Sequence, residues 1–82
     1  MDLLQQARAE IDAVDAEMAA LFERRMRAVA DVARYKAETG KPVFDAAREA
    51  AVLDKNAARI TDETLRPYYR AFLNDAMAVS RA

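Results

Sequence analysis

Three basic residues lie on or beside the apolar stripe of a long predicted helix. Between Asp2 and about Glu38 there is no proline or glycine, and apolar residues recur every three or four positions, as in an amphipathic helix: Leu4, Ala7, Ile11, Val14, Met18 and Leu21. The stripe continues through Arg25 and Lys36, and Arg8 borders its other end. Because burying an unpaired charge is costly, cations on such a stripe must be paired or must hold an anion. Their spacing predicts a pocket for a small polyanion.

The chain lacks the residue types on which several other kinds of catalysis depend. Its 82 residues include no cysteine, which excludes disulfide and thiolate chemistry, and no histidine, the usual general base and commonest metal ligand. A formal net charge of −1 argues against nucleic acid, which normally needs a strongly basic surface. No apolar run approaches the ~20 residues of a membrane span, and we expect no signal peptide. We expect a soluble, cytoplasmic protein with no cofactor or metal and no nucleic-acid or membrane partner.

The elements that position these residues are predicted to be helices. Alanine dominates the composition and glycine occurs once, which favours an all-α fold of three helices, one long and two shorter, within a single domain over residues 1–82. The long helix should end at Gly40, because glycine is a natural C-terminal stop and Pro42 blocks continuation.

Two shorter helices should follow. Asp45 is a good N-cap for a helix from Ala46 to about Arg59. Thr61 or Asp62 is the capping signal of the third helix, but the proline at position 67 is tolerated only within about the first turn and so favours a later start. The expected apolar positions of these two helices are Ala50, Val52, Leu53, Leu65, Tyr69, Phe72, Leu73, Ala76 and Met77.

The length of the first helix predicts a homodimer. About 37 residues span ~55 Å at 1.5 Å per residue, whereas a globule of this size has a radius of gyration of only ~12 Å. The helix must therefore extend beyond its own domain and expose its apolar stripe unless a second chain covers it. We expect an intertwined dimer with two-fold symmetry.

The same geometry predicts a pocket shared between chains. Arg8 and Arg25 are ~25 Å apart along one helix and cannot hold one small ligand together. If two such helices pair antiparallel and cross near residues 16 and 17, Arg8 of one chain faces Arg25 of the other. Arg25 and Lys36 are separated by about three turns, so both point the same way and can converge on a ligand between them. Two pockets per dimer follow.

Several segments together resemble a known family. The run RAEIDAVD from Arg8, then Arg25, then ARYK ending at Lys36, then PVFDAARE ending at Glu49, resembles the all-helical (AroQ-type) chorismate mutases. The resemblance covers essentially the whole chain, and the joint spacing is more specific than any single motif. It implies an intertwined homodimer of three-helix chains, and an isomerase that converts chorismate to prephenate in phenylalanine and tyrosine biosynthesis without a cofactor.

The resemblance also implies roles for the cations. Arg8, contributed by the partner chain, and Arg25 would bind the two carboxylates of chorismate, since an arginine fork suits a planar carboxylate. Lys36 would hold a carboxylate and the ether oxygen of the breaking bond. These three residues, together with Glu49, are the predicted catalytic set.

Further substrate-binding residues are implied on the second and third helices. Asp45 and Glu49 would meet the ring hydroxyl, the glutamate by its side chain. Arg48 would support the anion-binding cluster. Ser80 would hydrogen-bond a substrate carboxylate if the chain lacks one loop residue of the family pattern.

One position of the family pattern is absent. Family members usually carry a glutamine four residues after that serine, which donates to the ether oxygen, and this position would fall beyond Ala82. Losing one donor to developing negative charge typically costs ~10²–10³ in rate. Three explanations follow: a weak catalyst, a domain cut from a longer or fused protein, or replacement of the glutamine by another group such as Arg81.

Each signal also has a purely structural interpretation. Arg25 could belong to a solvated cluster with Arg24 and Arg27, and Lys36 could merely complement the helix dipole. Arg48 and Glu49 could be ordinary surface charges. Two other functions stay open: an isochorismate pyruvate lyase, with a similar fold and pocket, and a non-catalytic helical dimerisation or regulatory module. The presence of all the expected cations argues against the non-catalytic module, because a helix that served only as a dimer interface would favour apolar residues at these positions.

Overall fold

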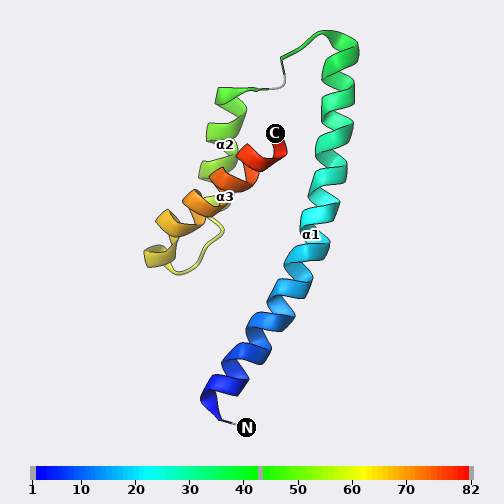
Figure 1. Cartoon of the computed structure of the whole chain (residues 1–82). Helices are drawn as coiled ribbons and strands as arrows, with labels where there is room; N and C mark the ends of the chain where they lie inside the picture. Colours follow the sequence, from blue (N-terminus) through cyan, green and yellow to red (C-terminus); the bar gives the residue numbers. More distant parts are fainter. Residues whose placement is uncertain (1, 43, 82) are drawn as a thin grey trace. The chain divides into compact units, whose positions relative to one another are not determined.

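The computed structural model describes residues 2–42 and 44–81, and the secondary structure in these ranges is entirely helical. Helix α1 covers Leu3–Thr39, α2 Ala46–Ala57 and α3 Arg66–Arg81, with a short 3-10 helix, η1, at Glu63–Leu65 (Figure 1). The predicted all-α fold is therefore confirmed. No helix of the described ranges combines the length and the apolar character needed to cross a membrane. The chain divides into two compact units, Met1–Arg34 and Tyr35–Ala82.

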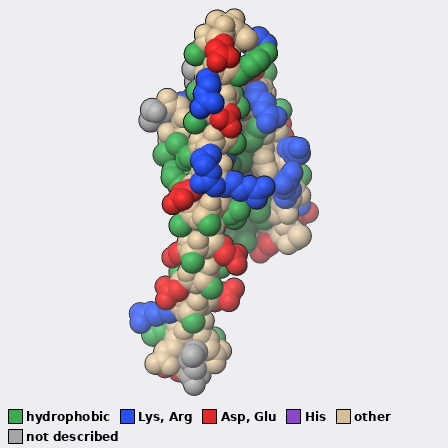
Figure 2. Space-filling model, turned by 90° about the vertical axis from the view of Figure 1, so that its right-hand side faces the viewer, with side chains coloured by type: hydrophobic (Ala, Val, Ile, Leu, Met, Phe, Trp, Pro, Cys, Tyr) green, Lys and Arg blue, Asp and Glu red, His purple; other side chains and the backbone are tan. Residues whose placement is uncertain are grey.

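The first unit is the greater part of α1, and the single chain does not cover its apolar stripe. Among the described residues of α1 none is buried, and Leu4, Ile11 and Met18 are 57%, 56% and 43% exposed. In the lower part of Figure 2, which shows the N-terminal stretch of α1, apolar side chains alternate with acidic ones. The carboxylate of Asp2 accepts a hydrogen bond from the Gln5 backbone N–H at 2.7 Å and so caps the helix start.

The C-terminal end of α1 belongs to the second unit and stops at Gly40, as predicted. Gly40 has a φ of 74°, the left-handed conformation that glycine adopts without a steric penalty. The Lys41 backbone N–H then donates to the Lys36 carbonyl at 3.0 Å. This is the 6→1 bond of a Schellman ending. It closes the last turn of α1, which carries Lys36, a residue predicted from the sequence to be catalytic.

Helix α2 begins where the sequence predicts. Asp45 has extended backbone angles, and its Oδ1 accepts a hydrogen bond from the Arg48 backbone N–H at 3.0 Å. This satisfies one of the unpaired N–H groups of the first turn. The helix ends at Ala57, slightly before the expected boundary near Arg59, because the chain closes into a turn in which the Ile60 N–H donates to the Ala57 carbonyl at 3.1 Å.

Helix α3 starts later than its first capping signal, as Pro67 requires. Asp62 caps η1 instead, accepting hydrogen bonds from the Thr64 hydroxyl at 2.6 Å and the Thr64 N–H at 3.0 Å. The hydroxyl first, and then the backbone N–H, lower the pKa of Asp62 from its ordinary value of 3.8. Pro67 is the second residue of α3, where its missing N–H has no intrahelical partner to lose.

The second unit has a small core between α2 and α3, which pack side by side (Figure 1). Its buried residues, among those described, are Ala57, Leu73 and Met77. An ion pair between Arg70 of α3 and Asp54 of α2, at 2.8 Å, adds a polar contact at the edge.

Two large apolar residues of the second unit that were expected on a covered face are exposed. Leu65 and Phe72 are 51% and 55% exposed, as is the neighbouring Tyr68, at 74%. Each of two short packed helices can bury only one face against the other, which leaves the remaining apolar side chains of α3 uncovered in a single chain.

Candidate active site

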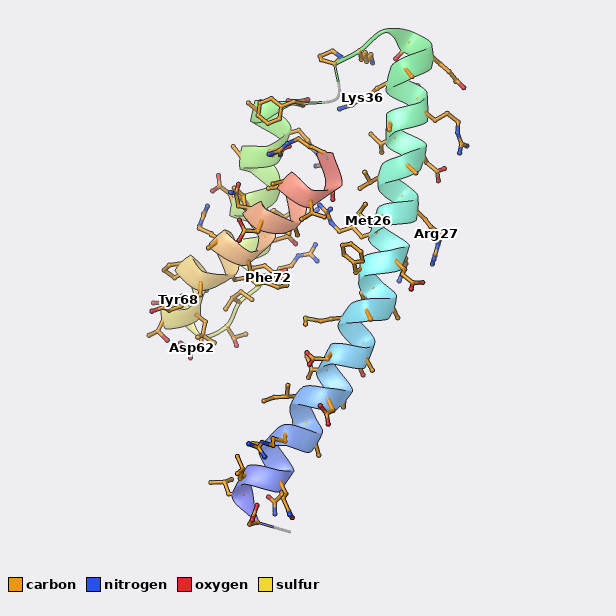
Figure 3. The ribbon with its side chains drawn as sticks, viewed as in Figure 1. Met26, Arg27, Lys36, Asp62, Tyr68 and Phe72 are labelled. Atoms are coloured by element: carbon orange, nitrogen blue, oxygen red, sulfur yellow. The ribbon has the colours of Figure 1, made fainter. Side chains whose placement is uncertain are left out.

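Two of the predicted anion-binding arginines lie in the first unit, on one uninterrupted helix. Arg8 is exposed and Arg25 is half-buried. Its neighbours differ: Arg24 is exposed, and Arg27 reaches Glu23 at 3.9 Å with 70% of its side chain exposed. Figure 3 shows Met26 and Arg27 leaving α1 on different sides. Arg25 is thus less exposed than the neighbouring arginines.

Lys36 lies in the last turn of α1, within the second unit. It is half-buried, and its side chain leaves the helix on the side of the loop leading to α2 (Figure 3). The capping bond to its own carbonyl fixes the backbone from which the ammonium extends. Nearby, the Lys41 ammonium lies 5.3 Å from the centroid of the Tyr35 ring. The turn that carries Lys36 is therefore held by a backbone cap and a cation–π contact.

The predicted residues of α2 occupy its N-cap and first turn. Asp45 uses Oδ1 to cap the helix. Arg48 is exposed, whereas Glu49 is half-buried, with 22% of its side chain accessible. The N-terminal end of a helix dipole favours negative charge, which suits a carboxylate there.

The end of α3 meets the start of α2. The Ser80 hydroxyl donates to the Ala76 carbonyl at 2.9 Å. The next residue, Arg81, uses Nη1 to donate to both carboxylate oxygens of Glu49, and its guanidinium lies 5.0 Å from the centroid of the Phe44 ring. The second unit thus brings Glu49, Arg81 and Phe44 together from three segments.

Sequence reasoning did not foresee the Arg81–Glu49 pair or the part played by Phe44. It named Arg81 only as a substitute for the missing glutamine. The one available signal was local: an aromatic residue immediately before the Asp45 N-cap must lie near the first turn of α2. Among the described residues no group of three or more His, Cys, Asp or Glu side chains could hold a metal ion.

Comparisons with known proteins show the family of the chain. Residues 7–82 match the family model of chorismate mutase type II. The chain belongs to this family. It is also similar to the T-protein of Haemophilus influenzae, with 30% identity over an alignment 83 positions long that covers 95% of this chain and 22% of the T-protein. The chain therefore spans about a fifth of the length of that curated relative.

A solved structure extends the likeness to three dimensions. Chorismate mutase (form II) from Thermus thermophilus superposes with a TM-score of 0.76 and 27% identity, over 98% of this chain and 96% of that one. The predicted resemblance to the all-helical chorismate mutases is confirmed, and with it the predicted fold.

Proposed function

We propose that this chain, as a single domain over residues 1–82, converts chorismate to prephenate in the cytoplasmic biosynthesis of phenylalanine and tyrosine. One observation carries the proposal: the family match over residues 7–82 includes every position to which a role is given below. The half-burial of Arg25, Lys36 and Glu49 supports it, because charged side chains are rarely withdrawn from water without a reason.

The reaction suits the residues that the chain contains. Conversion of chorismate to prephenate is a unimolecular Claisen rearrangement, in which one carbon–oxygen bond breaks as one carbon–carbon bond forms. It needs no nucleophile, proton transfer, metal or redox cofactor, so a chain without histidine or cysteine can catalyse it. The enzyme must hold a flexible dianion in a chair-like conformation and stabilise the charge that grows on the ether oxygen.

The cations divide these two tasks. Arg25, with Arg8 of the partner subunit, binds the two carboxylates and so restrains the substrate. Lys36 donates to the ether oxygen, where a preorganised positive charge stabilises the transition state more than the ground state. The capped final turn of α1 supports this role, because it limits the backbone motion of Lys36.

The remaining residues meet the ring and the rim of the substrate. Glu49 accepts a hydrogen bond from the ring hydroxyl through its side chain, and Asp45, whose Oδ1 already caps α2, contributes from its backbone. Arg48 adds positive charge near the carboxylates. Ser80, on the last turn of α3, hydrogen-bonds one of them.

We also propose that the active form is a homodimer with two shared sites. The exposed stripe of α1 needs a cover, and its charge distribution favours an antiparallel partner. Residues 2–17 hold five carboxylates and one arginine, whereas residues 23–38 hold five cations and three carboxylates. An antiparallel pair places the acidic half of each helix against the basic half of the other, and such complementarity fixes register.

The decisive experiment is a chorismate assay on the purified chain, with product identification. Prephenate formation above the uncatalysed rate is expected. Pyruvate release from isochorismate without prephenate would favour the lyase, and a folded dimer that turns over neither compound would favour the non-catalytic module.

Lys36→Ala should lower kcat by ~10³-fold, because it removes the donor to the developing negative charge. Its matched control is Lys55→Ala, which removes an exposed lysine from the last turn of α2. Circular dichroism should show both variants helical. An unchanged kcat in Lys36→Ala would contradict the role given to this residue.

A further inference from the structure

We propose that Arg81 is a positioning residue that acts through Glu49, by fixing its carboxylate for the substrate hydroxyl and neutralising its charge beside a dianionic substrate. The inference rests on the proposed function. It concerns a residue beyond the catalytic and substrate-binding set given above.

The geometry of the pair supports this role. Arg81 Nη1 donates to both Glu49 oxygens, which removes the rotational freedom of the carboxylate. An ionised carboxylate has about four acceptor sites on its two oxygens, so this contact leaves acceptor capacity for a substrate hydroxyl. Arg81 therefore orients Glu49 without exhausting it.

A third residue holds the arginine itself. The Phe44 ring lies 5.0 Å from the Arg81 guanidinium carbon, a cation–π distance. Phe44 directly precedes the N-cap of α2 and Glu49 lies in its first turn, whereas Arg81 ends α3. The guanidinium is thus fixed between the ring and the carboxylate, and it ties the last turn of α3 to the first turn of α2.

The two ion pairs between these helices differ in how exposed their side chains are. Arg70 and Asp54 also join α3 to α2, but their side chains are 46% and 72% exposed. Those of Arg81 and Glu49 are only 33% and 22% exposed. Surface pairs contribute little, and water screens less the more a pair is buried. Only the second pair includes a residue of the candidate site.

Charge gives the pair its functional importance. Chorismate carries two carboxylates, so a bare Glu49 carboxylate close to it would repel it. Arg81 offsets that repulsion while keeping Glu49 available as an acceptor. Removing the arginine should therefore weaken substrate binding, and removing the carboxylate as well should abolish the need for the arginine.

The test is a double-mutant cycle on prephenate formation, using the full 82-residue chain. Arg81→Ala should raise KM ~10-fold with a smaller change in kcat, whereas a merely structural defect would lower the active fraction and leave KM unchanged. In the Glu49→Gln background the same substitution should change KM less than ~2-fold, which is the non-additivity expected of residues that act as a unit. Arg81→Lys, which keeps the charge, should recover part of the loss.

Arg70→Ala is the matched control, because it removes an ion pair between the same two helices away from Glu49. It should leave KM and kcat unchanged. The proposal is overturned if Arg81→Ala behaves like Arg70→Ala, or if its full effect persists with Glu49→Gln, which would mean that Arg81 acts on the substrate directly. A wild-type chain without turnover would instead reject the proposed function, so the two failures are distinguishable.

Discussion

The N-terminal unit and the C-terminal unit are both amphipathic and helical, yet only one of them buries its own apolar residues. In the C-terminal unit α2 packs on α3, and Leu73 and Met77 are 8% and 5% exposed. In the N-terminal unit Leu21 and Met18, on the stripe of α1, remain 57% and 43% exposed. The difference shows that periodicity predicts which face of a helix is apolar but does not reveal what covers it.

The two units also hold their charged residues differently. In the N-terminal unit, Arg27 pairs with Glu23, its neighbour on the same helix. In the C-terminal unit, Arg81 and Arg70 reach carboxylates on a different helix. Part of the candidate site is therefore organised within one chain, whereas the proposed contribution of Arg8 depends on a second chain.

The largest expected effect is on the proposed dimer, from a substitution on the apolar stripe of the N-terminal unit. Met18→Glu puts a charge on the stripe near the proposed helix crossing, where the two-fold axis brings two copies together. We expect the dimer dissociation constant to rise by ~10³-fold or more, since an unpaired buried charge costs several kcal/mol, and turnover to fall with it. Sedimentation at several concentrations measures the first effect.

Arg27→Glu is the control for this prediction, because it reverses a charge on a side chain that is 70% exposed. It should leave the dimer intact. Wild-type assembly in Met18→Glu would mean that the stripe is not the interface.

A smaller effect is expected from the core of the C-terminal unit. Leu73→Ala leaves a cavity between α2 and α3, and burial of this residue predicts a loss of about 2–3 kcal/mol in the free energy of unfolding. Chemical denaturation measures it, and Val79→Ala on the same helix, 51% exposed, is the control. Equal losses in the two variants would contradict the core described here.

The smallest effect concerns acid stability at Asp62. Its pKa is lowered in the folded chain, so its contribution to stability is present above the unfolded pKa, near 3.8, and is lost as the pH falls through the folded value. Asp62→Asn keeps an acceptor for the η1 cap but does not titrate. Between about pH 6 and about pH 3 the wild-type melting temperature should fall slightly more than that of the variant. Identical acid profiles would mean that the Thr64 hydrogen bonds do not persist in solution.

Local chemistry made much of the fold predictable. Gly40 ends α1 because the turn needs a positive φ, Asp45 caps α2 through a bond within its own turn, and Pro67 delays α3 because of its missing N–H. Each depends on residues only a few positions away. The boundaries of the helices could therefore be predicted from neighbouring residues. The family could be predicted from the joint spacing of several segments.

What could not be predicted depends on how separate segments meet. Arg81 and Glu49 are 32 positions apart, and their pairing follows from the packing of α3 on α2, which no local pattern specifies. For the same reason Phe72 was expected on a covered face, although it is 55% exposed in the single chain. Helix periodicity identifies the apolar side chains but not the number of neighbours available to bury them.

The most direct test of the account is to mix Arg8→Ala chains with Arg25→Ala chains and to measure prephenate formation. Each homodimer should be nearly inactive, because every site lacks one arginine. In a heterodimer one site regains both arginines and the other loses both, so random mixing should restore about a quarter of wild-type turnover. No recovery, with heterodimers shown to form by mass spectrometry, would contradict a site shared between two chains.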